Sequence, residues 1–161
     1  MNTGLRIRRA TQHDAETVCR FVAAAAVEDG ANNAFTVDMY RRDAVGPNAR
    51  VEAWLVDDAR GKVCAQAIVA RGYDLARALP TMVLLHLYVN PDRRRDGVAR
   101  ELISAVAVRA KEAGVKELTI TTGVDNAVAR RFFEAIGARE LPLARYLLSA
   151  DGIEWLAAEA G

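Results

Sequence analysis

Residues 84–102 read LLHLYVNPDRRRDGVAREL, and the other elements of the chain can be placed from this stretch. Residues 84–89 are mostly apolar and include no Asp, Glu, Lys or Arg, which is typical of a strand covered on both faces of a central sheet. Pro91 ends this strand, because proline donates no ladder hydrogen bond and fixes its own φ. A helical period then begins at Val98, and its apolar face is formed by Ala99, Leu102, Ile103, Val106 and Ala110.

The turn between this strand and this helix is rich in arginine. Arg93, Arg94 and Arg95 stand just before Gly97. The first turn of a helix offers unpaired backbone N–H groups and the positive end of a dipole, and a glycine there allows a ligand to approach the backbone closely. The sequence therefore predicts an anion-binding turn in front of the helix.

The composition limits the classes of partner. Twenty-two Lys and Arg residues are balanced by 21 Asp and Glu residues, so the formal net charge of +1 gives no general reason to bind nucleic acid or a membrane surface. The first residues lack the apolar core of a signal peptide, and we expect a cytoplasmic protein. Cys19 and Cys64 have no CxxC spacing, so we expect free thiols and no metal site.

The remaining pattern predicts the other elements. Because the strand, helix, strand unit over 84–122 needs a crossover whereas hairpins do not, the element order β-α-α-β-β-β-α-β-α-β predicts a mixed, largely antiparallel sheet flanked by helices, an α/β fold. We expect residues 1–161 to form one domain. Before residue 84 we expect a strand over 5–9, a helix that starts near Thr11 and ends at residues 28–30, a short helix over 36–45, and a hairpin of strands 51–56 and 63–70. A loop over 71–81 follows, which carries Tyr73 and Pro80 and is able to cover a ligand. After the long helix we expect a strand over 117–122, a helix capped by Asp125 or Asn126 and closed by Gly137, a strand over 144–149 and a helical tail over 153–160.

Two motifs resemble those of one enzyme family. The chain contains neither GxxxxGK[ST] nor GxGxxG, which argues against a P-loop enzyme and a Rossmann cofactor. Residues 89–103, VNPDRRRDGVARELI, resemble the acyl-CoA signature V-x-P-x-x-R-x-x-G-x-G-x-x-L-L of the GCN5-related N-acetyltransferase (GNAT) family, whose core is Q or R-x-x-G-x-G or A. Residues 126–137, NAVARRFFEAIG, are similar to a second motif of that family, N-x-x-A-x-x-F-Y-E-x-x-G.

This resemblance extends from Leu5 to about Leu156, and residues 46–56, 76–89 and 145–157 look like the diamine N-acetyltransferase branch. It implies the GNAT fold, acetyl-CoA as acyl donor, a primary amine of a small molecule as acceptor, direct attack of that amine on the thioester, and a homodimer. By position, it implies that Leu87 and Val89 bind the pantetheine arm, and that Asn126 and Phe133 lie at the CoA arm. The residues that it implies for the pyrophosphate are Arg94, Arg95, Asp96, Gly97, Val98, Ala99 and Arg100, mainly through backbone N–H groups.

The departures from the family concern catalysis. Phe133 stands where the family commonly has a tyrosine that protonates the leaving thiolate, so we expect a slower reaction rather than none. In the diamine branch a glutamate of the central strand is a proposed base, and its position here is Leu85. Because histidine titrates near neutral pH, His86 is the best candidate base, with Tyr88 on the same face as its partner and Tyr73 as an outside candidate. A structural role for His86 remains open.

The acceptor is the least determined part. A polyamine needs carboxylates for its ammonium groups, and the candidates are Glu28, Asp29, Asp38 and Glu154, which also suit an ordinary charged surface. A less cationic small amine fits at least as well. The alternative function is an acyl-CoA-binding module with a sensing or regulatory role that has lost the chemistry. Nucleic-acid binding through the arginines is disfavoured by the net charge.

Overall fold

The computed structural model of the protein describes residues 4–160 and divides into two compact units, one ending at Thr122 and one starting at Gly123. The first unit contains a five-stranded sheet in the order β1-β2-β3-β4-β5. All neighbouring strands are antiparallel except β4 and β5, which are parallel and joined by a helix. The strands are β1 (Arg6–Arg9), β2 (Val51–Asp57), β3 (Val63–Asp74), β4 (Leu79–Val89) and β5 (Glu117–Ile120). The predicted mixed sheet is therefore confirmed.

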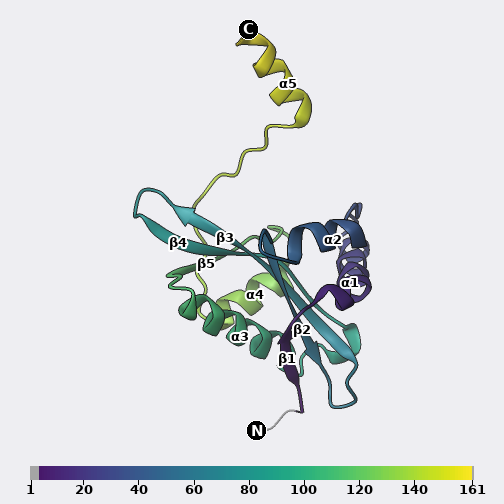
Figure 1. The fold of residues 1–161 in the computed structure, drawn as a ribbon. Helices are drawn as coiled ribbons and strands as arrows, with labels where there is room; N and C mark the ends of the chain where they lie inside the picture. The colour runs from purple at the N-terminus through teal and green to yellow at the C-terminus, as the bar shows by residue number, and fades with distance from the viewer. Residues whose placement is uncertain (1–3, 161) are drawn as a thin grey trace. The chain divides into compact units, whose positions relative to one another are not determined.

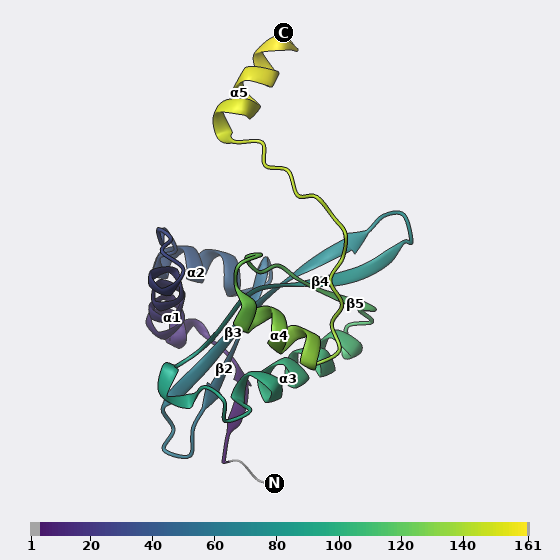
Figure 2. The ribbon, with the colours of Figure 1, turned by 180° about the vertical axis from the view of Figure 1, so that it is seen from behind.

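Helices cover both faces of this sheet. α1 (Ala15–Glu28) and α2 (Val37–Ala44) lie on one face, and α3 (Val98–Glu112) lies on the other (Figures 1 and 2). The predicted apolar stripe of α3 is confirmed at Leu102, Ile103, Val106 and Ala110, which are all buried, whereas Ala99 is only partly buried. A short 3₁₀ helix, η1 (Gln12–Asp14), leads into α1, and a second one, η2 (Pro91–Arg93), follows β4.

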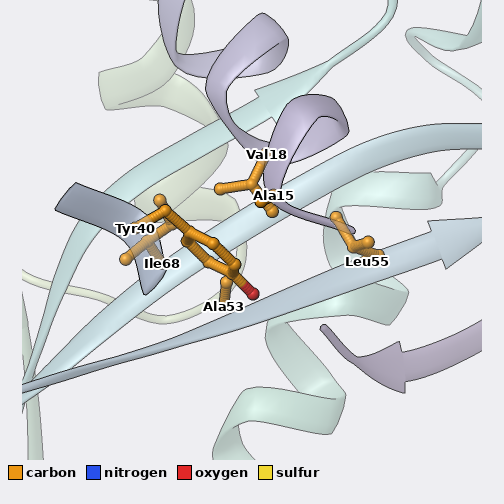
Figure 3. Close-up of a cluster of buried hydrophobic side chains, with 6 residues drawn as sticks. All are labelled: Ala15, Val18, Tyr40, Ala53, Leu55 and Ile68. Carbon is orange, nitrogen blue, oxygen red and sulfur yellow. The ribbon is translucent and has the colours of Figure 1, made fainter. Parts of the chain in front are cut away.

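The core between α1, α2 and the sheet contains a compact cluster of apolar side chains (Figure 3). Tyr40 lies within it, and its hydroxyl donates a hydrogen bond of 3.0 Å to the carbonyl of Thr11. Burial raises the pKa of Tyr40 to about 12, so its phenol stays protonated at any physiological pH. The cluster consists of Ala15, Val18, Tyr40, Ala53, Leu55 and Ile68.

The segment over 71–81 was predicted to be a loop, but it forms the outer part of a long hairpin. β3 continues to Asp74 and β4 begins at Leu79, with Tyr73 paired to Pro80 (Figure 1). The connecting turn contains no glycine, and Ala78 adopts a positive φ of 50° instead. Because the usual glycine signal of a hairpin turn is missing, the sequence pattern predicts a loop where the chain forms a hairpin.

The second unit contains α4 (Ala127–Ala135) and α5 (Ala150–Glu159). The predicted strand over 144–149 is wrong, because residues 138–149 have no regular structure and pair with none of the described strands. An apolar run indicates burial, whereas a strand also needs a neighbour for its backbone groups. The helical tail starts earlier than predicted, since the Ser149 side chain caps it by accepting a hydrogen bond of 3.2 Å from the N–H of Gly152.

The buried cluster predicts a large effect of Leu55, which is 0% exposed. Leu55→Ala removes apolar contacts and leaves a cavity, so we expect the free energy of unfolding to fall by about 2–5 kcal/mol in urea denaturation. Leu75→Ala is the matched control, because Leu75 is 85% exposed at the tip of the hairpin and should change stability by less than about 0.5 kcal/mol. Equal losses in the two variants would contradict this assignment of the core.

Candidate functional site

The turn before α3 has an unusual backbone. Arg95 and Gly97 both take positive φ, 68° and 80° respectively, and Gly97 is the residue that caps α3. No side chain caps the helix start. A Cβ atom built on Gly97 meets no atom within 4 Å, so the space in front of the helix is open to a ligand.

The backbone N–H groups of this turn are free to bind an anion. Within residues 4–160, the N–H groups of residues 95–100 have no hydrogen-bond partner, and the first paired one is that of Glu101, which donates 3.1 Å to the carbonyl of Gly97. Unpaired N–H groups at a helix start, together with the helix dipole, favour a phosphate or another anion. The turn thus presents an array of unpaired donors, and its binding of an anion stays a prediction.

β4 changes its pairing at Leu85. Its parallel pairing with β5 ends at Leu84, which lies opposite Ile120. In the antiparallel pair with β3, Ile68 lies opposite His86 and Val69 opposite Leu84, so a bulge leaves Leu85 without a direct partner. From there to Val89, the sheet flanks β4 only on its β3 side, and the opposite backbone edge is free of any described strand. Leu87 and Val89 belong to this free edge.

The same bulge corrects one prediction. The run 84–89 was expected to be covered on both faces, but Leu85 is 55% exposed. Alternation from the buried Leu84 would in any case turn Leu85 to the other face, and the bulge removes its cross-strand neighbour as well. An apolar residue type alone does not report such an interruption.

The arginines of the turn differ in their partners. Arg94 turns back along β4, where its Nε donates 2.9 Å to the carbonyl of Val89 and one terminal nitrogen lies 2.8 Å from each carboxylate oxygen of Glu28. Arg93 lies 3.4 Å from both Asp58 and Asp96. Arg95 and Arg100 form no ion pair in the described part of the chain, so their charges are available to a ligand.

His86 and Tyr88 lie on the same face of β4, as predicted. Their rings are stacked with centroids 6.5 Å apart. His86 Nε2 is buried and has no hydrogen-bond partner among the described residues. Burial lowers the pKa of His86 to about 4, against a smaller opposing effect of the charge on Asp29. The expectation that His86 titrates near neutral pH is therefore wrong, because desolvation disfavours its charged form.

Tyr88 is held from the side of α1. Its hydroxyl donates 3.2 Å to a carboxylate oxygen of Glu28, and its ring lies 5.5 Å from that of Phe21. Burial first, and then the charge of Glu28, raises the pKa of Tyr88, so the phenol is protonated at neutral pH. Tyr73 lies too far along the hairpin to assist His86, because its partner Pro80 is about 20 Å from His86 at strand spacing.

The second unit contains the two remaining predicted site residues. Asn126 caps α4, as one of the two predicted caps, and its Oδ1 accepts 3.0 Å from the N–H of Ala129. This leaves the amide NH₂ of its side chain for other contacts. Phe133 packs edge to face against Phe132, with ring centroids 5.3 Å apart. Their proposed contacts with CoA stay predictions.

The carboxylates that are candidates for binding a polyamine also differ in their partners. Glu28 is engaged by Arg94 and Tyr88, and Asp38 lies 3.8 Å from Arg41. Asp29, at the end of α1, acts electrostatically on His86, and Glu154 is exposed on α5. The contact between Glu28 and Arg94 was missed from the sequence, since the two residues are 66 positions apart and no local pattern joins them.

Comparisons with known proteins agree with this geometry. The profile of the family described as "Acetyltransferase (GNAT) family" matches residues 29–138. An integron cassette protein from the mobile metagenome of V. cholerae superimposes with a TM-score of 0.78 and 20% identity, over 96% of this chain and 98% of that chain. No sequence among the curated proteins matches the chain.

Two further solved structures have enzymatic names. A ribosomal-protein-alanine N-acetyltransferase from Brucella melitensis biovar Abortus 2308 has a TM-score of 0.76 at 20% identity, over 91% of this chain and 99% of that chain. An aminoglycoside acetyltransferase from an uncultured soil metagenomic sample, solved with trehalose, has a TM-score of 0.75 at 15% identity, over 91% and 97%. At these identities the likeness concerns the fold.

None of the helices over residues 4–160 has the length and apolar character that a membrane span requires.

The burial of His86 predicts how stability depends on pH. The ring has a pKa of about 4 in the folded chain, below the value of about 6.5 expected when unfolded, so between these values the unfolded chain binds a proton that the folded chain does not. Stability should therefore fall as the pH falls below about 6.5, with a loss of about 2 kcal/mol from this residue at pH 5. Urea denaturation of the protein and of His86→Gln at pH 7 and pH 5 measures it. An identical pH dependence of the two proteins would contradict the burial argument.

Proposed function

The chain belongs to the GNAT family of acetyltransferases and is an N-acetyltransferase, and from this premise we propose that it transfers the acetyl group of acetyl-CoA to a primary amine of a small molecule. The observation that carries the proposal is the set of unpaired N–H groups of residues 95–100, in front of α3 and beside the free edge of β4. Family members use acetyl-CoA as the acyl donor, and its pyrophosphate is the kind of anion that such a turn binds.

The donor is held mainly by the backbone. The pyrophosphate accepts hydrogen bonds from the turn, and Arg95 and Arg100 add charge that no carboxylate of the described chain neutralises. The amides of the pantetheine arm pair with the free edge of β4 at Leu87 and Val89, as an added strand would. From Val89 back to Leu85 the strand covers about 13 Å, which brings the thioester toward the bulge and His86.

The reaction is a direct displacement. The neutral amine nitrogen attacks the thioester carbon, a C–N bond forms, the C–S bond breaks, and the CoA thiolate leaves. The nitrogen loses one proton, and that proton ends on the CoA thiolate or in the solvent. Because a thiol has a pKa of about 8.5, the thiolate leaves without an obligatory acid, which agrees with phenylalanine at position 133.

The base determines which amines are suitable. His86 is neutral at pH 7 and has an unpartnered Nε2, but a pKa of about 4 makes it a weak base. Taking a proton from a free alkylammonium with a pKa of about 10 is unfavourable by about 8 kcal/mol. We therefore assign His86 to the later proton transfer, after the nitrogen has bonded to carbon and become far more acidic. Tyr88 orients the His86 ring by stacking.

An acceptor of low basicity follows from the same argument. A primary amine that is already neutral when bound avoids the unfavourable first proton transfer, whereas a polyamine would arrive as a polycation. Glu28, one of the carboxylates available to a polyamine, is engaged by Arg94. We therefore favour a weakly basic small amine over the diamine class. The ribosomal-protein-alanine N-acetyltransferase among the structural neighbours supports amine acetylation in general. A homodimer and a cytoplasmic location remain proposals from the family resemblance.

Thiol release from acetyl-CoA tests this function. We expect release above hydrolysis with at least one weakly basic primary amine, in a panel that also contains spermidine, lysine and simple alkylamines. His86→Ala should lower kcat at pH 7 about 10- to 100-fold and leave acetyl-CoA affinity within about 2-fold. If no amine is acetylated although acetyl-CoA binds in calorimetry, the chain is the binding module instead. Equal kcat in the variant would remove His86 from the mechanism.

Gly97 offers a sharper test of the donor site. In Gly97→Val the branched side chain would fill the open space in front of α3 and would oppose the positive φ of 80°, so acetyl-CoA binding should be lost in calorimetry. Gly114→Val is the matched control, because Gly114 ends the same helix with a φ of 71° and equally open surroundings. The control variant should bind acetyl-CoA like the unmodified protein. Unchanged affinity in Gly97→Val would refute the site.

A further inference from the structure

Glu28 and Arg94 connect the end of α1 to the turn before α3. A terminal nitrogen of Arg94 lies 2.8 Å from both carboxylate oxygens of Glu28. The same carboxylate accepts 3.2 Å from the hydroxyl of Tyr88, and the guanidinium lies over the Tyr88 ring, 5.5 Å from its centroid. Three separate elements, α1, β4 and the turn, therefore meet through one carboxylate.

The position of Glu28 at the end of α1 does not by itself stabilise this helix. A carboxylate in the last turn of a helix faces the negative end of the dipole, and the last turn of α1 contains no basic residue that would compensate. The compensating charge comes from Arg94. The side chains of both residues are 42% exposed, so the ion pair adds little to global stability.

The pair has a clear consequence for the direction of Arg94. With Nε bound to the carbonyl of Val89 and the terminal nitrogen bound to Glu28, the guanidinium lies back along β4. Arg94 is the residue that leads into the strained part of the turn, where Arg95 takes a positive φ. Holding its side chain fixes the start of that turn and withholds its charge from the space in front of the N–H groups of residues 95–100.

We propose that Glu28 is a positioning residue for acetyl-CoA, which acts through Arg94 by holding the turn in the form whose backbone N–H groups receive the pyrophosphate. This role rests on the proposed function and adds to it a residue outside both motifs. When the carboxylate is lost, the turn spends part of its time in other forms, and the apparent affinity falls by the fraction of molecules that are competent to bind.

Three variants test the role. Glu28→Gln keeps the length of the side chain and an oxygen that accepts from Tyr88, but it loses the charge. Arg94→Gln keeps the signature, which permits Gln or Arg, and a donor for Val89. Each should raise the Kd for acetyl-CoA about 3- to 10-fold in calorimetry, and Glu28→Gln should keep kcat at saturating acetyl-CoA within about 2-fold. The double variant should be no weaker than the weaker single variant, because both changes break one interaction.

Glu16→Gln is the matched control, since Glu16 is an exposed carboxylate in the first turn of the same helix. It should leave the Kd unchanged, and each of the two variants, Glu16→Gln and Glu28→Gln, should shift the melting temperature of the unmodified protein by no more than about 5 °C. If the protein binds acetyl-CoA and Glu28→Gln binds it equally well, or if the two single effects add in the double variant, this inference alone is overturned. If the unmodified protein binds no acetyl-CoA, the proposed function is overturned together with it.

Discussion

The candidate site depends on β4, which has a paired strand on both sides from Thr81 to Leu84 and on one side only from Leu85 to Val89. A strand with neighbours on both sides has no unpaired backbone groups. The last residues of β4 have a neighbouring strand on one side only, so one backbone edge of β4 is left without a strand there. The bulge at Leu85 marks the change. α3 follows Val89 after a turn of eight residues, and the proposed function has one extended ligand use both the free edge and the unpaired N–H groups of this turn.

The two parts of the candidate site differ in their exposure to solvent, and this difference has opposite effects on charged groups. At the turn, the open space beside Gly97 leaves the backbone groups available to a charged ligand. At His86, burial removes the charged form and leaves a neutral ring with an unsatisfied nitrogen. A ring of this kind accepts a proton only from a strongly acidic donor, such as the cationic nitrogen formed during acyl transfer. In the proposed mechanism, the burial of His86 therefore determines the step in which this ring takes up a proton and, through that step, the basicity of the acceptor.

The sequence predicted best where one local pattern determines the outcome. The strand, the arginine turn and the helix over 84–112 follow from the polarity pattern, Pro91 and Gly97, and Asn126 caps α4 as an Asn before an apolar helix should. The predictions that were wrong concern residues whose structure depends on contacts with distant parts of the chain. The run over 144–149 has a strand-like composition but no neighbouring strand, and His86 has an ordinary residue type in an unusual environment. The hairpin at 71–81 was missed because Ala78 replaces the expected glycine.

Arg94 illustrates how far a motif residue can be interpreted from its type. An arginine in an anion-binding signature is naturally expected to face the anion, yet its guanidinium is bound to Glu28 and to the carbonyl of Val89. Arg93 is likewise occupied, by Asp58 and Asp96. What the turn offers to the proposed ligand is therefore chiefly a set of backbone donors, whose direction is set by φ values that depend little on side-chain type. In the proposed function, such a site holds the phosphate groups of the donor, and the choice of acceptor depends on the environment of His86.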